Sequence, residues 1–204
     1  SWSRGLGDVY KRQINNFIDN LPGVSVHEGD AFGFDDWSTA ITVRGFQTNL
    51  AEQQVGSTID GLPNGNSNYG GGAKANRYID AANLETIEVS QGTADISSRS
   101  LESLGGTLNY VTADPTLDQR VRLEYVTGQY EAQRLYARYD SGLIGPSTRF
   151  YISASHQEAT DWMEGSAQNE RDHLAAKLLT GSEDLSFTAY ISYDEIHEDN
   201  YQRV

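Results

Sequence analysis

The chain has 204 residues, enough for one or two domains, and its formal net charge of -14 argues against partners such as nucleic acid. The absence of cysteine excludes disulfides, thiolate metal sites and a cysteine nucleophile. Tyrosine and glycine are abundant, at 12 and 20 residues, which favours β-structure. No apolar run approaches the ~20 residues of a transmembrane helix, and no signal peptide is visible.

Residues 1–13 do not fit the pattern of the rest of the chain. The string from Arg4 to Gln13 resembles translated sequencing-adapter sequence, so we treat 1–13 as a non-native leader and exclude it from the fold prediction. On this interpretation Ile14 lies within a longer protein. The end of the chain at Val204, just after a strand-like run, is expected to be a truncation as well.

Residues 14–116 are predicted to form a small α+β domain with long polar loops. A helix is expected at its start, because apolar residues recur at helical spacing before Pro22–Gly23: Ile14, Phe17, Ile18 and Leu21. Short strands with a period of two follow. Their predicted bounds are Ile41–Phe46, Ser57–Asp60, Ile87–Val89 and Thr107–Thr112. The segment from Leu62 to Asn76 reads as a loop of Asn and Gly.

Residues 117–204 contain five runs in which apolar and polar residues alternate. Each run is about as long as the ~9–11 residues that a tilted strand needs to cross a bilayer. We expect one antiparallel meander with the apolar set on a lipid-facing side: Val121, Leu123, Leu135, Ala137, Phe150, Ile152, Leu174, Leu178, Phe187 and Ile191. The opposite side should carry Arg122, Arg134, Arg138, Ser153, Lys177 and Thr188.

The connections between these runs differ in length. Those at 128–130 and 181–183 are tight, whereas Glu158–Arg171 reads as a long polar loop. Short turns on one side and long loops on the other are typical of outer-membrane barrels. A soluble β-sandwich or meander alternates in the same way, so the runs alone leave that alternative open.

Five motifs in the first domain occur in a characteristic order: LPGV at 21–24, ITVRGF at 41–46, IDGLP at 59–63, LETIEV at 84–89 and GGTLNYVT at 105–112. Together they resemble the plug domain of TonB-dependent outer-membrane receptors. One departure is Ser90–Thr93, where that family usually has Arg-Gly-Pro after the strand, which suggests a subgroup. The overall texture of the sequence, including the run Gly105–Thr112, also resembles ferric-citrate-type receptors.

The resemblance implies an α+β plug with a small mixed sheet at 14–116, followed at 117–204 by the first strands of a transmembrane antiparallel β-barrel. The signal peptide, the TonB box and the first plug strand would precede Ile14, and most of the barrel would follow Val204. The implied function is energised uptake of a ferric siderophore or similar iron chelate, in the outer membrane of a Gram-negative bacterium. TonB, acting on the N-terminal box, and membrane lipid are the implied partners. The resemblance implies that the protein is not an enzyme and that it has no catalytic residue and no cofactor.

Six residues are candidates for a functional role. Arg44 either forms an ion pair with a Glu of the barrel wall or is a solvated surface residue. Asn64, Asn66, Asn68 and Tyr69 offer donors and a stacking face to a polar chelate, or belong to a generic loop. In the expected outer loop, Trp162 either touches ligand or joins an aromatic girdle. No metal site is predicted, since the four His residues form no metal-binding motif.

Two alternatives remain open on the sequence alone. The chain could be a soluble carbohydrate-binding or hydrolytic β-rich protein that uses a carboxylate pair such as Asp194–Glu195. The apolar stripe from Leu185 to Tyr193 distinguishes the two, because a sandwich covers it and a barrel turns it to lipid. The chain by itself could also lack activity, because so few strands cannot close a barrel.

Overall fold

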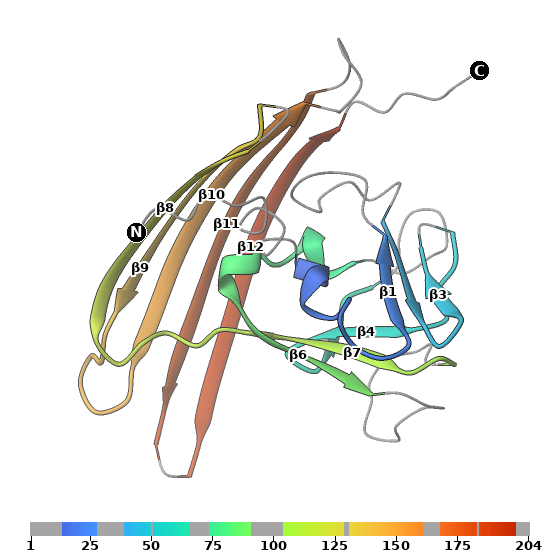
Figure 1. The fold of residues 1–204 in the computed structure, drawn as a ribbon. Coiled ribbons are helices and arrows are strands. Elements are labelled where there is room, and N and C mark those ends of the chain that lie inside the picture. Colours follow the sequence, from blue (N-terminus) through green and yellow to red (C-terminus); the bar gives the residue numbers. More distant parts are fainter. Residues whose placement is uncertain are drawn as a thin grey trace. The chain divides into compact units, whose positions relative to one another are not determined.

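The computed structural model describes residues 14–27, 39–49, 51–65, 74–90, 104–128, 131–160, 168–182 and 184–198. The chain divides into two compact units between Ala113 and Asp114, and Figure 1 shows the elements of each. The expected leader, residues 1–13, lies outside the described ranges. Within those ranges no helix is long and apolar enough to span a membrane.

The first unit contains two small sheets and three short 3₁₀ helices among its described residues. One sheet is antiparallel with the order β1-β2-β3, and the other has the order β5-β4-β7-β6. The second sheet is mixed, as predicted, because β4 and β7 run parallel while their neighbours are antiparallel. The elements are η1 (Ile14–Phe17), β1 (Val24–His27), β2 (Ala40–Val43), β3 (Phe46–Thr48), β4 (Gly56–Ile59), β5 (Leu62–Pro63), η2 (Ala75–Arg77), η3 (Ala81–Asn83), β6 (Leu84–Ser90) and β7 (Thr107–Thr112).

Two of the sequence motifs, ITVRGF and IDGLP, contain tight hairpin turns. Arg44 and Gly45 have φ of 51° and 88°, and Asp60 and Gly61 have φ of 49° and 76°. Positive φ at both central residues is the backbone of a two-residue β-hairpin turn, and Gly adopts it without steric cost. The predicted single strand Ile41–Phe46 is therefore wrong, because the chain reverses at Arg44 and pairs β2 with β3.

The predicted N-terminal helix is much shorter than expected. η1 covers one turn, and the hydrogen bonds beyond it span three residues, from Ile18 N to Asn15 O (3.1 Å) and from Leu21 N to Ile18 O (2.9 Å). Gly23, with φ of 77°, then turns the chain into β1. Up to the Pro22–Gly23 stop, 3₁₀ geometry satisfies these backbone groups.

The hydrophobic core of the first unit lies between the short helices and both sheets. Its buried members are Ile14, Ile18, Val24, Ile41, Val43, Val55, Ala75, Ile79, Leu108 and Tyr110. Burying each of the larger side chains contributes about 1.5–3 kcal/mol. The Tyr110 hydroxyl within this core donates to Asn15 Oδ1 at 2.9 Å, which ties η1 to the central strand β7.

The second unit is an antiparallel meander, and each strand pairs with the next in sequence. Figure 1 shows its long strands side by side, from yellow-green β8 to red β12. They are β8 (Gln119–Thr127), β9 (Gln133–Ser141), β10 (Arg149–Thr160), β11 (Gln168–Gly181) and β12 (Ser186–Glu198). The meander prediction is confirmed for the described residues.

The long loop predicted at Glu158–Arg171 is wrong in extent. β10 and β11 stay paired to the end of both strands, where Thr160 lies opposite Gln168. Both faces of this hairpin are polar near its end, so the sequence loses the hydrophobic alternation although the backbone pairing continues. Residues 161–167 lie outside the described ranges.

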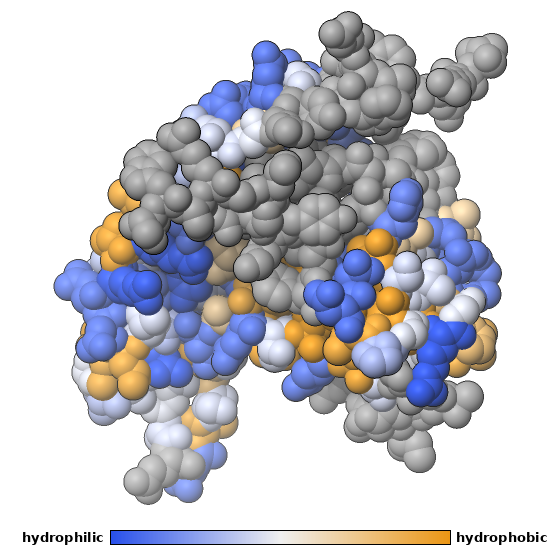
Figure 2. All heavy atoms as spheres, viewed as in Figure 1, coloured by the Kyte–Doolittle hydropathy of each residue, from blue (hydrophilic) through white to orange (hydrophobic). Residues whose placement is uncertain are grey.

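The two faces of this sheet differ in exposure as well as in chemistry. Leu123 and Ile191 are 72% and 71% exposed, whereas Arg134 and Lys177 are 1% and 5% exposed. The register places the predicted apolar and polar sets on opposite faces, as expected, while the lipid-facing role of the apolar side stays a prediction. In the view of Figure 2, apolar residues of the strands reach the surface as separate orange patches.

Candidate functional site

The charged face of the five-stranded sheet is the main candidate site of the second unit. Alternate residues of β8 to β12 point to it, because side chains on a strand alternate between faces. We call it the polar face, and its members include Arg122, Glu124, Arg134, Tyr136, Arg138, Asp140, Tyr151, Ser153, Ser155, Gln157, Arg171, His173, Lys177 and Asp194. Most of these side chains are buried, so this face of the sheet holds buried charge.

A bidentate ion pair crosses from β11 to β12 on the polar face. Asp194 accepts from Arg171 Nε and Nη2, both at 2.7 Å. His173, directly opposite Asp194 in register, places Nδ1 3.4 Å from the second Asp194 oxygen. The fork geometry of Arg matches a carboxylate, which makes this pair strong and directional.

A second group lies on β9 and β10. Arg138 donates to both oxygens of Asp140, at 2.9 and 2.7 Å, and its guanidinium lies 3.8 Å from the centre of the Tyr151 ring. A guanidinium this close to a ring face gains a cation–π attraction. Also on β9, the guanidinium of Arg134 lies 5.1 Å from the centre of the Tyr136 ring. The polar face therefore presents fixed charges and rings suited to polar, not apolar, surroundings.

An ionisable group also lies on the opposite, exposed face. His156 Nδ1 is 2.9 Å from Asp172 Oδ1 and 3.9 Å from Glu170 Oε1. These are donor types that bind divalent cations. All three side chains are solvent-accessible, and an exposed ion pair accounts for the geometry without a metal.

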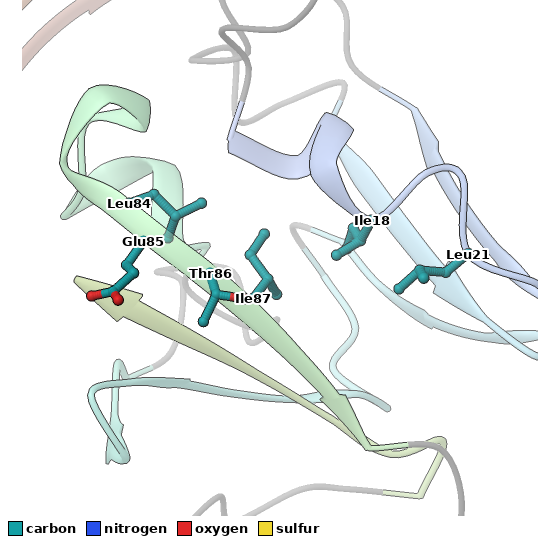
Figure 3. Close-up of a pocket in the computed structure, with 6 residues that line it drawn as sticks. All are labelled: Ile18, Leu21, Leu84, Glu85, Thr86 and Ile87. Atoms are coloured by element: carbon teal, nitrogen blue, oxygen red, sulfur yellow. The ribbon is translucent and has the colours of Figure 1, made fainter. Parts of the chain in front are cut away.

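The first unit contains a cavity of about 230 Å³ between the turn after η1 and strand β6. Figure 3 shows Ile18 and Leu21 on one side and Leu84 and Ile87 on the other. A β-bulge between Leu84 and Thr86 breaks the alternation, which lets Leu84 and Ile87 share a side. Glu85 and Thr86 also line the cavity, so its wall is partly polar.

The structure places two of the six candidate residues. Arg44 is exposed in the β2–β3 turn rather than within a strand. Its backbone N donates to Gly23 O at 2.7 Å, and a Cβ at Gly23 would lie only 3.3 Å from Arg44 Cγ, which links the LPGV and RGF motifs. Asn64 is half-buried just after β5. The other candidates, Asn66, Asn68, Tyr69 and Trp162, lie outside the described residues.

The carboxylates of the carbohydrate or hydrolase alternative do not meet in one site. Asp194 lies on the polar face with Arg171, whereas Glu195 lies on the exposed face, where it accepts from the Tyr193 hydroxyl at 3.0 Å. Neighbouring residues on a strand point to opposite sides, so this pair cannot share a substrate.

The ion pairs of the polar face belong to the candidate site and were not predicted from the sequence. Arg171 and Asp194, which form an ion pair, are 23 residues apart, and Arg138 donates a hydrogen bond to the backbone oxygen of Asp114 across 24 residues. Alternation predicted the face of each residue but not the register, and register decides which charges meet.

A protein-family model decides the assignment of the first unit. The model of the TonB-dependent Receptor Plug Domain matches residues 5–107. This chain belongs to the TonB-dependent receptor plug domain family. The first unit is therefore the plug, with its small mixed sheet, and the meander that follows it resembles the start of a receptor barrel.

Solved receptor structures share the fold of both units. The pyoverdine outer-membrane receptor FpvA from Pseudomonas aeruginosa PAO1, solved with pyoverdine bound, matches 92% of this chain with a TM-score of 0.72 and 21% identity. The ferric-catecholate import receptor Fiu from E. coli K12 matches 95% with a TM-score of 0.66 and 20% identity. The ferric citrate transporter FecA matches 92% with a TM-score of 0.66 and 18% identity.

The chain spans only part of these receptors, covering 26% of FpvA, 26% of Fiu and 29% of FecA. The named relatives are receptors and transporters, and FpvA is an outer-membrane protein. At these identities the likeness concerns the fold, and the ligand has to be argued separately.

Proposed function

We propose that this chain is part of a TonB-dependent receptor that carries an iron chelate, most simply a ferric siderophore or ferric citrate, across a Gram-negative outer membrane. In this proposal β8 to β12 begin the receptor's barrel, and TonB engages a box on the N-terminal side of the plug. Uptake without chemical conversion needs no catalytic residue and no cofactor.

The distribution of charge over the meander is the observation that carries the proposal. Arg or Lys facing a bilayer midplane costs roughly 2–4 kcal/mol, so a membrane strand turns them to the lumen. Here Arg134, Arg171 and Lys177 are buried while Leu123 and Ile191 are exposed. A soluble sheet would bury its apolar face instead.

The apolar band also crosses the sheet diagonally. Tyr125 and Leu135 lie in one row of register partners whose members on β11 and β12 are the charged Asp172 and Glu195. On β12 the exposed apolar residues instead continue in the other direction, as far as Phe187. In a barrel the strands tilt, so an apolar band that is level with the membrane crosses the rows of register partners at an angle.

The ligand contacts are proposed on the plug and on the outer loops. Asn64, Asn66, Asn68 and Tyr69 provide amide and aromatic groups for a polar chelate, and Trp162 adds a ring. For Arg44 we propose an ion pair with a Glu on the barrel wall, for which its exposed position at a hairpin tip leaves the guanidinium available.

The test uses the full-length receptor that contains this chain, in a host lacking its own iron receptors. Uptake of radioactive iron is measured with ferric citrate, a ferric catecholate and ferric pyoverdine as separate probes, with and without a protonophore. We expect at least one probe to be taken up, and the protonophore to abolish that uptake.

Failure of all three probes to bind the purified receptor would contradict the iron-chelate proposal. Uptake that persists in the protonophore would contradict energised transport. The variant lacking the TonB box serves as the control, since it should bind the probe without taking it up.

A further inference from the structure

Three cationic side chains from three adjacent strands converge on Asp114, the first residue of the second unit. Lys177 Nζ of β11 lies 2.8 Å from Asp114 Oδ1, and Arg149 Nη2 of β10 lies 3.5 Å from Oδ2. Arg138 Nη2 of β9 donates to the Asp114 backbone oxygen at 3.0 Å. One residue of the connecting segment is thus bound through its side chain and its main chain.

The cations that hold Asp114 are themselves fixed. The Lys177 and Arg138 side chains are 5% and 6% exposed, and Asp114 itself is about half exposed at 48%. Asp140 accepts two hydrogen bonds from Arg138, and the Tyr151 ring lies over the Arg138 guanidinium. A buried charge held by several partners does not reorient freely, so Arg138 is a fixed donor to the Asp114 backbone oxygen, while the buried Lys177 contacts the Asp114 carboxylate.

The residues after Asp114 are tied to the same strands. Thr116 N donates to Asp140 Oδ1 at 3.1 Å, and Leu117 O accepts from Leu143 N at 2.9 Å. Pro115, which lies between Asp114 and Thr116, has a restricted φ. Two hydrogen bonds also hold the end of the plug within the first unit, from Thr112 N to Asp60 Oδ1 (2.8 Å) and from Ala113 N to Asn83 O (2.7 Å).

We propose that Asp114, with Lys177, Arg149, Arg138 and Asp140, forms a junction clamp that fixes the point where the plug ends and the barrel begins. The plug's last strand, β7, ends at Thr112, so the chain passes directly from the plug into the clamp. Asp114 to Leu117 then stay fixed to the strands of the second unit during any rearrangement of the plug. The functional consequence rests on the proposed transport, but the clamp does not.

The experiment measures hydrogen–deuterium exchange of residues 111–119 in the full-length receptor, without ligand and without transport. Asp114→Asn removes the carboxylate charge and keeps the main-chain acceptor. Asp118→Asn is the matched control, because it removes the same charge four residues later. We expect Asp114→Asn to speed exchange in this segment by about tenfold or more, with no change for Asp118→Asn.

Lys177 variants separate charge from packing. Lys177→Met should speed exchange in 111–119, and Lys177→Arg, which keeps the charge, should retain the protection. Adding Lys177→Met to Asp114→Asn should have little further effect, because both act through one interaction. Failure of Asp114→Asn to assemble while Asp118→Asn assembles would also support the clamp.

Equal exchange in Asp114→Asn, Asp118→Asn and the parent would overturn the clamp. So would equal exchange in the Lys177→Met and Lys177→Arg variants. Because neither readout involves iron, a receptor that fails to transport any chelate can still show the clamp, and a transporting receptor can still lack it.

Discussion

Asp60 links a hairpin turn to the last plug strand. Its left-handed backbone opens the turn with Gly61, while its carboxylate accepts from Thr112 N at 2.8 Å and Thr112 Oγ1 at 2.5 Å. The IDGLP motif is therefore explained by two requirements at one position: a residue that tolerates positive φ, and a short acceptor that reaches β7.

Replacing Asp60 should loosen β7. We expect Asp60→Ala to lower the free energy of local opening at Thr112 by about 1–3 kcal/mol, because a buried donor pair loses its acceptor. Amide exchange at Thr112 in the folded receptor measures it. Glu85→Ala, which removes an exposed carboxylate of the same unit, should leave that exchange rate unchanged.

The Arg171–Asp194 pair should be costly to break from one side only. The side chains of Arg171 and Asp194 are 4% and 11% exposed. Asp194→Ala is therefore expected to lower the free energy of unfolding by about 3–5 kcal/mol. The midpoint of thermal unfolding, followed by electrophoretic mobility, reports the loss. Asp184→Ala, at an exposed position before β12, is the control. A midpoint shared by both variants would mean that the pair does not stabilise the wall.

At the scale of elements, the strands of the second unit could be predicted because alternation persists over whole strands. The prediction failed where that signal ends. The described residues at the end of the β10–β11 hairpin, Glu158 to Thr160 and Gln168 to Arg171, are mostly polar, so the sequence predicted a loop where the backbone is paired. Arg44 was predicted as a strand residue, because a turn of only two residues does not interrupt the alternation of apolar and polar residues.

The candidate site was less predictable than the fold. Asn and Tyr in a glycine-rich segment suggest a binding loop from composition alone, and four of the six candidates lie outside the described residues. The charge pairs of the polar face needed the register, which no local pattern specifies.

Arginine placed on the two faces of β12 should have unequal effects. Ile191→Arg puts a charge on the exposed apolar face and is expected to cost roughly 2–4 kcal/mol in membrane assembly. Thr188→Arg puts the same charge on the opposite face of the same strand and should be tolerated. The yield of folded receptor in the outer-membrane fraction compares them. Equal yields would argue against a lipid-facing side.

At the scale of the whole molecule, the two units have different kinds of stability. The plug has an aliphatic core of its own between short elements. The meander instead exposes its apolar side chains and covers its charges, an arrangement that is stable only where lipid replaces water on the exposed face. Membership of the plug family and the fold shared with receptor barrels agree with this division.

The most direct test of this account is the accessibility of single nitroxide labels along β10 in the reconstituted full-length receptor. This chain has no cysteine, so cysteines introduced one at a time from Phe150 to Ser155 give unambiguous sites within it. Oxygen, which concentrates in lipid, should relax labels at 150, 152 and 154 more strongly than labels at 151, 153 and 155. Oxygen maxima at Tyr151, Ser153 and Ser155, or no alternation between the two sets, would contradict a membrane-spanning strand.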